Sequence, residues 1–271
     1  MKIRLDGMGG MCRLLGMFAN KPVDLEFSLE RFKEYSASNP DGWGMGWYEN
    51  NSPKVCKQGI PAKAKDSKLP TSSKEALSKI IIAHVRKGTG AEPSKRNSHP
   101  FKYKNWLFAH NGRVDKGYLF SLLKSEYKNE IKGETDSEVY FYWILQNIED
   151  YGDALTGIKE AIKKVIQKDY SGLNFLLSNG KSLHAFRYSS RSPDYYSLYK
   201  LKRDPSERGP LELKSEETKA LLRSKSLKRE KAILVCSEKL TREEGKSWEE
   251  VKFGNILIIS SDLSMKEERI V

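Results

Sequence analysis

Cys12 stands at the start of an apolar strand, in the string MCRLLGMF, and a short leader rich in Gly and Met precedes it. If the leader is absent from the working protein, Cys12 carries both a thiol and an α-amine, so that nucleophile and general base belong to one residue. A chain that works in this way must fold so that three later segments reach Cys12. These segments are AHVRKGTG with Arg86, FAHNGRVD with Asn111 and Gly112, and GETDSE with Asp136.

The apolar pattern of the 271 residues predicts strands and helices that alternate along the chain. Strands and helices in these numbers predict a layered α/β or α+β domain, and composition alone leaves several architectures open. The predicted strands are 13–18, 43–48, 53–58, 80–86, 105–110, 173–178, 182–188, 197–201, 233–237 and 256–260, and the predicted helices are 26–37, 74–79, 115–124, 136–148 and 154–168.

Five short motifs carry a resemblance to a known family. They lie at residues 11–16, 84–86, 97–101, 110–112 and 135–138, and their order and spacing resemble those of class II glutamine amidotransferases, in particular the stand-alone group of single-domain members. Each motif alone arises by chance in many proteins, but the five together are specific. The resemblance implies an α+β fold, a four-layer αββα sandwich of the N-terminal nucleophile hydrolase type, in which two antiparallel sheets lie between helical layers.

The resemblance also implies catalytic roles for three residues. Cys12 would attack the side-chain amide of glutamine, and its α-amine would take the thiol proton and return it to the leaving ammonia. The Asn111 side-chain amide and the Gly112 backbone N–H would donate to the oxyanion of the tetrahedral intermediate. Without the family pattern, Cys12 reads as an inert thiol and Asn-Gly as an ordinary hairpin turn.

Four further residues are expected in the substrate-binding part of the site. Arg86 ends an apolar strand and would hold the α-carboxylate of glutamine, while Asp136 opens a helix and would accept the α-ammonium. The plainer interpretations are a solvated strand-end arginine and a helix-capping carboxylate. His84 and His99 lie inside the matched segments and are expected to support the pocket through hydrogen bonds, because the amine of Cys12 replaces a catalytic imidazole in this family.

The eleven residues before Cys12 depart from the family pattern, whose members usually begin Met-Cys. Residues 1–11 are therefore expected to be a leader, either because Met11 is the true initiator or because a propeptide is cut off, and residues 12–271 a single amidotransferase domain. If the leader stays in place, the chain is a non-catalytic protein.

Composition excludes several other classes of protein. The net charge of +12 at pH 7 suggests nucleic acid, but Lys and Arg alternate with Glu as on a solvated helix face, so no nucleic-acid partner is expected. No membrane partner is expected, because no stretch approaches the roughly 18 apolar residues of a membrane span. The 3 cysteines are too few and too scattered for a disulfide framework or a zinc site, which predicts a cytoplasmic protein with no metal and no cofactor.

The expected activity is glutamine hydrolysis through a Cys12 thioester with release of ammonia. One alternative is a γ-glutamyl amide or peptide hydrolase of the same fold, and another is a non-catalytic, glutamine-binding regulatory subunit. The motifs extend along essentially the entire chain, so a separate acceptor or synthase subunit is implied if ammonia is transferred.

Overall fold

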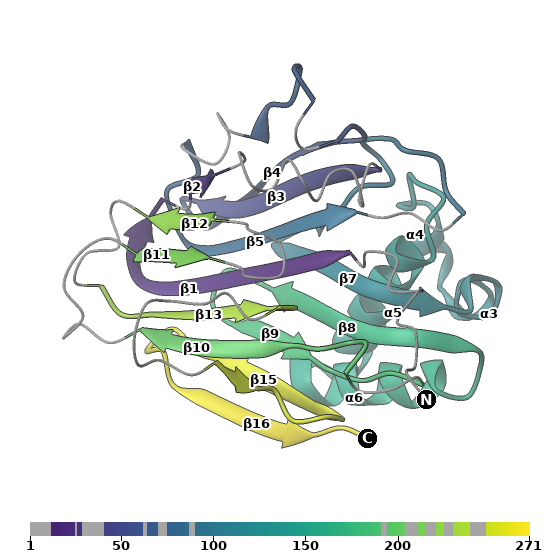
Figure 1. Cartoon of the computed structure of the whole chain (residues 1–271). Helices are drawn as coiled ribbons and strands as arrows, with labels where there is room; N and C mark the ends of the chain where they lie inside the picture. Colours follow the sequence, from purple (N-terminus) through teal and green to yellow (C-terminus); the bar gives the residue numbers. More distant parts are fainter. Residues whose placement is uncertain are drawn as a thin grey trace, which may run out of the picture.

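The computed structural model of the chain describes residues 12–24, 26–28, 41–61, 64–69, 75–86, 90–190, 194–203, 211–214, 221–224, 230–238 and 248–271. Within these residues, two large antiparallel sheets pack against each other, and helices cover the second of them (Figure 1). This agrees with the α+β sandwich that the family resemblance implies.

The first sheet places β1 and β5 next to each other at its centre. Its strand order is β14-β10-β13-β1-β5-β3-β4, and every neighbouring pair is antiparallel. Its strands are β1 (Arg13–Val23), β3 (Gly42–Glu49), β4 (Ser52–Gln58), β5 (Ser78–Arg86), β10 (Tyr199–Arg203), β13 (Ala232–Cys236) and β14 (Glu249–Glu250).

The second sheet carries the Asn-Gly motif on its strand β7. Its order is β16-β15-β9-β8-β7-β6, and a small third sheet has the order β11-β12-β2. The strands of the second sheet are β6 (Phe101–Tyr103), β7 (Trp106–Val114), β8 (Tyr170–Ser178), β9 (Leu183–Phe186), β15 (Asn255–Ile259) and β16 (Met265–Arg269), and those of the third are β2 (Glu26–Ser28), β11 (Leu211–Lys214) and β12 (Leu221–Ser224).

The two faces of β7 explain how the layers hold together. Leu107 and Ala109 point toward the first sheet and pack against residues such as Leu14 and Ile82, whereas Phe108 belongs to the core under the helices. Successive residues of a strand face opposite sides of a sheet, so a strand buried on both faces reads as a continuous apolar run. The string WLFAH has this character.

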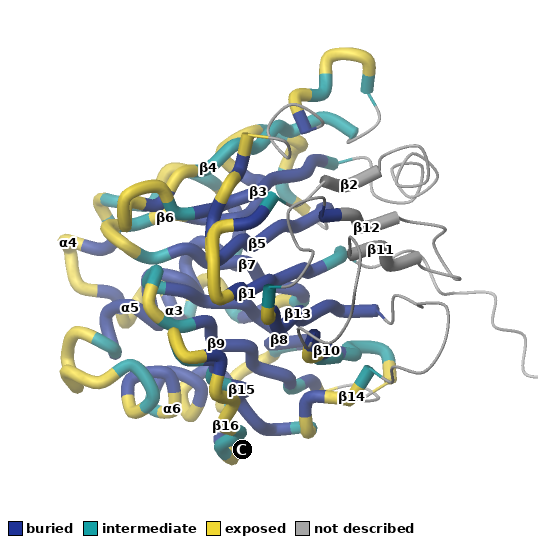
Figure 2. Tube along the Cα trace, turned by 90° about the vertical axis from the view of Figure 1, so that its left-hand side faces the viewer, coloured by how far each residue is buried: buried dark blue, intermediate teal, exposed yellow. Residues whose placement is uncertain are grey.

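The helices pack on the outer face of the second sheet. Aromatic rings form much of this contact, and the centroids of Phe108 and of Phe141 on α5 lie 5.3 Å apart. On α6 the buried residues include Ile158, Ile162 and Val165, which recur at helical spacing. The helices are α3 (Lys116–Leu122), α4 (Ser125–Lys128), α5 (Asp136–Tyr151) and α6 (Ala154–Val165), and Figure 2 shows the buried strands between exposed turns and loops.

One predicted helix begins as a strand. Residues 26–28 form β2, in which Phe27 pairs with Leu222 of β12, so the prediction of a helix over 26–37 is wrong at its start. Backbone pairing with a strand almost two hundred residues away leaves no local signal, and it overrides helical periodicity. Residues 29–37 lie outside the described residues. The short helix predicted at 74–79 is also wrong at its end, because β5 begins at Ser78.

Candidate active site

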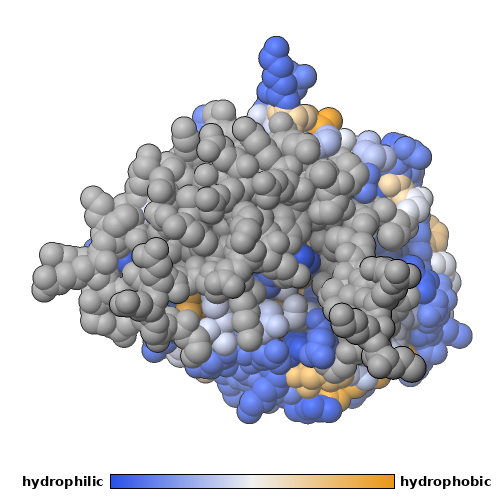
Figure 3. Space-filling model, in the orientation of Figure 1, coloured by the Kyte–Doolittle hydropathy of each residue, from blue (hydrophilic) through white to orange (hydrophobic). Residues whose placement is uncertain are grey.

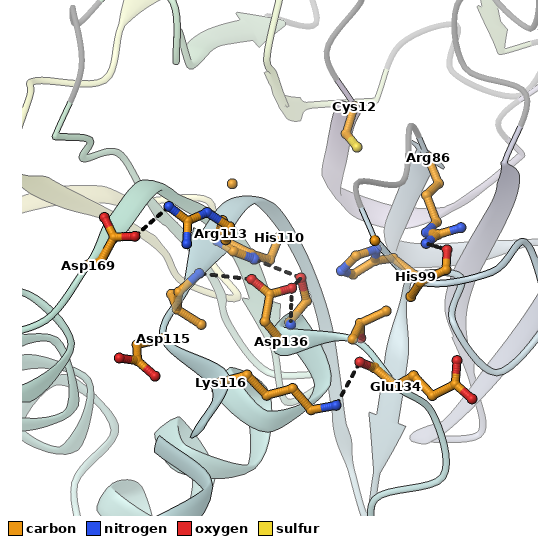
Figure 4. Close-up of a pocket in the computed structure, with 16 residues that line it drawn as sticks. Cys12, Arg86, His99, His110, Arg113, Asp115, Lys116, Glu134, Asp136 and Asp169 are labelled. Atoms are coloured by element: carbon orange, nitrogen blue, oxygen red, sulfur yellow. Dashed lines mark hydrogen bonds and ion pairs between the residues drawn. The ribbon is translucent and has the colours of Figure 1, made fainter. Parts of the chain in front are cut away.

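A pocket of about 390 Å³ lies where the first sheet, the second sheet and the start of α5 meet. Arg13 lies opposite Val85 in the antiparallel pair of β1 and β5, so Cys12 before β1 comes to the end of β5, where Arg86 stands. Figure 4 shows the side chains around this pocket. The lining residues are Cys12, Arg86, Gly90, Ala91, His99, His110, Gly112, Arg113, Val114, Asp115, Lys116, Glu134, Thr135, Asp136, Ser137 and Asp169.

Asn111 lies directly behind Cys12. Its Nδ2 donates to the backbone carbonyl of Cys12 at 2.7 Å, and its Oδ1 lies 3.1 Å from Nε2 of His84. The carbonyl can only accept, so this contact assigns Nδ2 and Oδ1 of the amide without ambiguity. A primary amide has two N–H groups, and the contact with Cys12 uses one of them.

The His84 imidazole is the group that holds the other end of the Asn111 amide. Burial lowers the pKa of His84 to about 3, so the ring is neutral. Since Oδ1 of Asn111 accepts, Nε2 of His84 carries the proton and donates it. Nδ1 is then an acceptor, and it has no hydrogen-bond partner in the described part of the chain. His84 does not line the pocket but stands one layer behind it.

His99 forms part of the pocket wall and packs against His84. The two ring centroids are 4.3 Å apart, and neither nitrogen of His99 has a hydrogen-bond partner among the described residues. Burial lowers its pKa well below the usual value. His99 is therefore a neutral imidazole whose hydrogen-bonding capacity is unused.

The Asn111-Gly112 pair lies inside β7 and not in a hairpin turn. Its partners on β8 are Asn174 and Leu173. A Cβ on Gly112 would lie 1.9 Å from the carbonyl oxygen of Gly172, and Gly112 has a φ of +137°, so no other residue fits this position. The plain turn interpretation of Asn-Gly is thus wrong, because a close approach of β7 to β8 requires the glycine.

Arg86 is a buried cation and not a solvated strand end. Only 4% of the residue is exposed, and its guanidinium donates to the carbonyls of Asp41 at 3.2 Å and Ala91 at 2.7 Å. A guanidinium carries five N–H donors, so these two contacts leave donors for a ligand in the pocket that Arg86 lines.

Asp136 is held by backbone donors at the first position of α5. Its Oδ2 accepts from the N–H of Val114 at 2.8 Å, and its Oδ1 accepts from the N–H of Ser137 at 2.9 Å. Thr135 is the residue that caps the helix, through its hydroxyl and the N–H of Glu138. The carboxylate is therefore not the cap. It lies in the wall of the pocket (Figure 4).

His110 connects β7 to the start of α5. Its Nε2 donates to the carbonyl of Gly172 at 3.1 Å, which leaves Nδ1 to accept from the Ser137 hydroxyl at 2.9 Å. Burial lowers the pKa of His110, and it also lowers that of His184 on β9, to about 4. All 4 histidines of the chain are thus buried with lowered pKa values.

Sequence reasoning missed the charged rim of the pocket. Arg113 donates to Asp169 at 2.6 Å, and Lys116 donates to the carbonyl of Glu134 at 2.8 Å. Arg113 and Glu134 directly flank the recognised motifs, and Lys116 follows three residues after Arg113, which is the signal that could have found them. Asp169 has no such signal, because the ion pair joins residues far apart in the chain.

The described residues hold no cluster of three His, Cys, Asp or Glu side chains with the geometry of a metal site. None of the described helices is long and apolar enough to cross a membrane. Cys236 on β13 is buried, and burial raises the pKa of its thiol to about 12.

Comparisons with known proteins agree on one family. The model of the class II glutamine amidotransferases matches residues 11–267. An uncharacterized protein of Methanocaldococcus jannaschii is 34% identical over 249 residues, which cover 88% of this chain and 67% of the relative.

Two other comparisons are more distant. A gamma-glutamyl-hercynylcysteine sulfoxide hydrolase of Mycobacterium tuberculosis is 28% identical over 157 residues, which are 57% of this chain and 62% of the relative. A crystal structure described as a predicted glutamine amidotransferase from Pseudomonas aeruginosa superposes with a TM-score of 0.65 at 24% identity, over 92% of this chain and 98% of that one. The likeness in structure supports the sandwich fold.

Proposed function

The chain belongs to the class II glutamine amidotransferases, and we propose that it hydrolyses the side-chain amide of glutamine through a thioester on Cys12. The observation that carries the proposal is the hydrogen bond of 2.7 Å between the Asn111 amide and the Cys12 carbonyl, because it brings this amide to the backbone of Cys12 and so supports an oxyanion role for Asn111. A glutaminase assay of protein that begins at Cys12 tests it directly. Absence of turnover would favour the alternative of a non-catalytic regulatory subunit.

In the proposed reaction, the α-amine of Cys12 takes the thiol proton while sulfur attacks the side-chain carbonyl carbon of glutamine. The remaining N–H of the Asn111 amide and the N–H of Gly112 donate to the oxyanion. The tetrahedral intermediate collapses, the C–N bond breaks, and ammonia leaves with the proton from the amine. Water then attacks the thioester, which releases glutamate and restores the thiol.

His84 acts in this scheme as a positioning residue. The ring is neutral and its Nε2–H donates to Oδ1 of Asn111, so it prevents the amide from turning its oxygen toward the substrate. Such a hydrogen bond also polarises the amide and strengthens its N–H donors. This assignment places His84 behind the oxyanion donor and leaves direct substrate binding to residues of the pocket wall.

Arg86 and Asp136 bind the amino-acid head group of the substrate. The buried guanidinium has donors for the α-carboxylate, and the carboxylate of Asp136 has lone pairs for the α-ammonium beyond its two backbone contacts. Both groups are held in place before the substrate arrives, which lowers the entropy cost of binding. His99 shares this wall and offers a neutral donor and acceptor to the substrate.

The mechanism requires that residues 1–11 are removed, because only then does Cys12 have an α-amine. The family match begins at residue 11, which supports Met11 as the initiator. Mass spectrometry of natively produced protein is expected to show a chain that begins at Cys12. Active protein that keeps the leader would overturn the role of the amine as base.

A γ-glutamyl amide or peptide is the second candidate substrate, because one relative is named as a γ-glutamyl hydrolase. Both substrates present the same α-carboxylate and α-ammonium to Arg86 and Asp136, and they differ only in the leaving group. The ratio of kcat/KM for glutamine and for a γ-glutamyl dipeptide separates the two. A ratio strongly in favour of the dipeptide would assign the protein to the hydrolases.

We further propose a cytoplasmic location and a separate acceptor or synthase subunit that uses the ammonia. The cysteine content supports the first, and membership of the class II glutamine amidotransferases supports the second. The described surface seen in Figure 3 is largely hydrophilic. Co-purification from the native source, followed by a glutaminase assay with and without the recovered partner, tests whether the activity depends on a separate subunit. Equal turnover in both assays would argue against dependence on a partner.

A further inference from the structure

A second pocket, of about 660 Å³, shares two chain segments with the catalytic pocket. In the segment 94–102, His99 lines the catalytic pocket, and most of the other residues line the second pocket. The segment 130–138 likewise presents Glu134 to Ser137 to the first pocket, and Lys132 and Glu138 to the second. The two pockets are therefore neighbours that are separated by common walls.

Basic side chains outnumber acidic ones in the lining of the second pocket, and one of them, Arg96, forms an ion pair of 3.0 Å with Glu134. Five cationic side chains and two carboxylates line it, and both oxygens of the buried Glu138 already accept backbone N–H groups, from Lys132 at 3.1 Å and Gly133 at 2.6 Å. The other carboxylate is that of Glu130. The full lining is Val55, Lys57, Ser94, Lys95, Arg96, Pro100, Phe101, Lys102, Glu130, Lys132, Glu138 and Tyr142.

Lys57 is the cation that the pocket holds most deeply. Its ammonium donates to the carbonyl of Ser98 at 2.6 Å and lies 4.8 Å from the centroid of the Phe101 ring. No carboxylate of the described residues forms an ion pair with it, although an ammonium has three donors. Burial lowers the pKa of Lys57 to about 8, because desolvation disfavours the ammonium more than the charge of the Glu138 carboxylate favours it.

We propose that the second pocket binds a compact dianionic small molecule of the phosphate type, with Lys57 at its base and Lys95 and Lys102 at its rim. A lysine ammonium binds phosphate as a point charge, and several lysines around one concave space focus their potential into it. The volume is in the range of small-molecule sites, which favours a free metabolite over an extended acidic segment of a protein. Binding of an anion in this pocket does not require the glutaminase activity.

The first test is calorimetric titration of the full-length protein with inorganic phosphate near pH 7.5, at constant ionic strength. One saturable site is expected. The variant Lys95→Gln with Lys102→Gln removes two exposed rim charges and is expected to weaken binding roughly tenfold or more. The matched control is Lys159→Gln with Lys181→Gln, which removes two exposed charges outside the pocket and should leave binding unchanged. Heat without saturation, or equal affinity in both variants, would overturn the site.

The second test uses sulfate, which keeps its two charges between about pH 7 and pH 9. Affinity is expected to fall across this range, because Lys57 with a pKa of about 8 must regain its proton to bind an anion. Lys57→Arg keeps its charge and should remove this pH dependence. The same pH dependence in wild type and Lys57→Arg would exclude Lys57 as the anion-binding group. The charged and titratable groups that face Lys57 are Lys95, Arg96, Lys102, Glu130, Lys132, Glu138 and Tyr142.

Because the walls are shared, an anion in the second pocket contacts the segments that hold His99 and Asp136. Bound phosphate is therefore expected to change KM for glutamine more than kcat, and to lose this effect in the rim variant. If calorimetry shows that phosphate binds but KM for glutamine is the same with and without phosphate, the connection between the pockets is overturned. This kinetic arm rests on the proposed glutaminase activity, whereas calorimetry measures the site without it.

Discussion

The two walls of the catalytic pocket differ in charge. The wall beside the nucleophile, here the reaction wall, holds neutral donors and acceptors that are almost completely buried, such as Asn111 at 6% and His84 at 2% exposure. The opposite wall, the recognition wall, holds ionised side chains and reaches solvent, with Asp169 72% exposed. The reaction wall consists of Cys12 and Gly112 at the pocket surface, with Asn111 and His84 directly behind them, and the recognition wall consists of Arg86, Arg113, Asp136 and Asp169.

This difference separates two tasks. Buried dipoles need no reorganisation when charge develops in the transition state, so they act mainly on kcat. Fixed charges attract a zwitterionic head group equally in the ground state and the transition state, so they act mainly on KM. Substitutions on the two walls should therefore divide by kinetic parameter, and the five below are ordered by expected effect.

Cys12→Ala is expected to abolish glutamine hydrolysis, because it removes the thiol that forms the acyl-enzyme. The pocket should still bind glutamine, since the recognition wall is intact. Assay of released ammonia and calorimetric binding of glutamine check both halves. Residual turnover above background would show that another residue is the nucleophile.

Asn111→Ala is expected to lower kcat by about 10²- to 10³-fold with a smaller change in KM, as the loss of one oxyanion donor does. The matched control is Asn174→Ala. Asn174 lies opposite Asn111 on β8 and donates to the carbonyl of Tyr196, outside the pocket. This control should lose stability but keep kcat. An unchanged kcat for Asn111→Ala would disprove the oxyanion role.

Asp136→Asn is expected to raise KM for glutamine by roughly 10- to 100-fold, since it removes one charge-assisted hydrogen bond to the α-ammonium. Arg86→Ala should act in the same direction through the α-carboxylate. Steady-state kinetics over a range of glutamine concentrations check this. A fall in kcat at unchanged KM would place these residues with the reaction wall.

His84→Ala is expected to lower kcat about tenfold, because an unanchored Asn111 amide loses orientation and polarisation. The pH profile distinguishes positioning from proton transfer. On the acid limb of the pH profile, kcat/KM should fall as the α-amine of Cys12 becomes protonated, with a pKa near 7.7 to 8. The amine must be unprotonated to accept the thiol proton. The His84 pKa of about 3 lies far below this limb, so the limb should be unchanged in the variant. A shifted limb would instead identify His84 as a base.

Arg113→Gln should have the smallest effect, a change in KM of less than about fivefold. Its ion pair with Asp169 lies at the rim, where the two side chains are 50% and 72% exposed, and exposed pairs contribute little. A loss as large as that of Asp136→Asn would mean that Arg113 contacts the substrate.

Motif order predicted which residues come together at the reaction wall, because they lie on β5 and β7 or directly before β1, and the apolar runs of these three strands are visible in the sequence. The placement of Asn111-Gly112 inside a strand required the structure. Locally the pair favours a turn, and only the pairing of Gly112 with β8 shows why a strand needs it. The catalytic roles themselves remain predictions.

The recognition wall was less predictable because its contacts join distant segments. Arg86 could be read from the strand that it ends, but the Arg113–Asp169 pair spans 56 positions and has no periodicity. The pairing of residues 26–28 with β12 escaped prediction for the same reason. Local sequence propensity predicts single helices and strands. Which segments far apart in the chain come into contact is decided by long-range pairing, which leaves no local pattern.

Burial of every imidazole makes folding of this protein depend on protons. Between about pH 6.5 and pH 4 an unfolded chain binds protons at its 4 histidines, while the folded chain, with lowered pKa values at all of them, leaves most of these sites empty. The stability that neutral histidines contribute is present above pH 6.5 and is lost as pH falls, for His84 and His184 by about 1.4 kcal/mol each per pH unit until pH reaches their pKa values of about 3 and about 4. Mild acid therefore destabilises the folded protein, because the unfolded chain binds protons that the folded chain cannot bind.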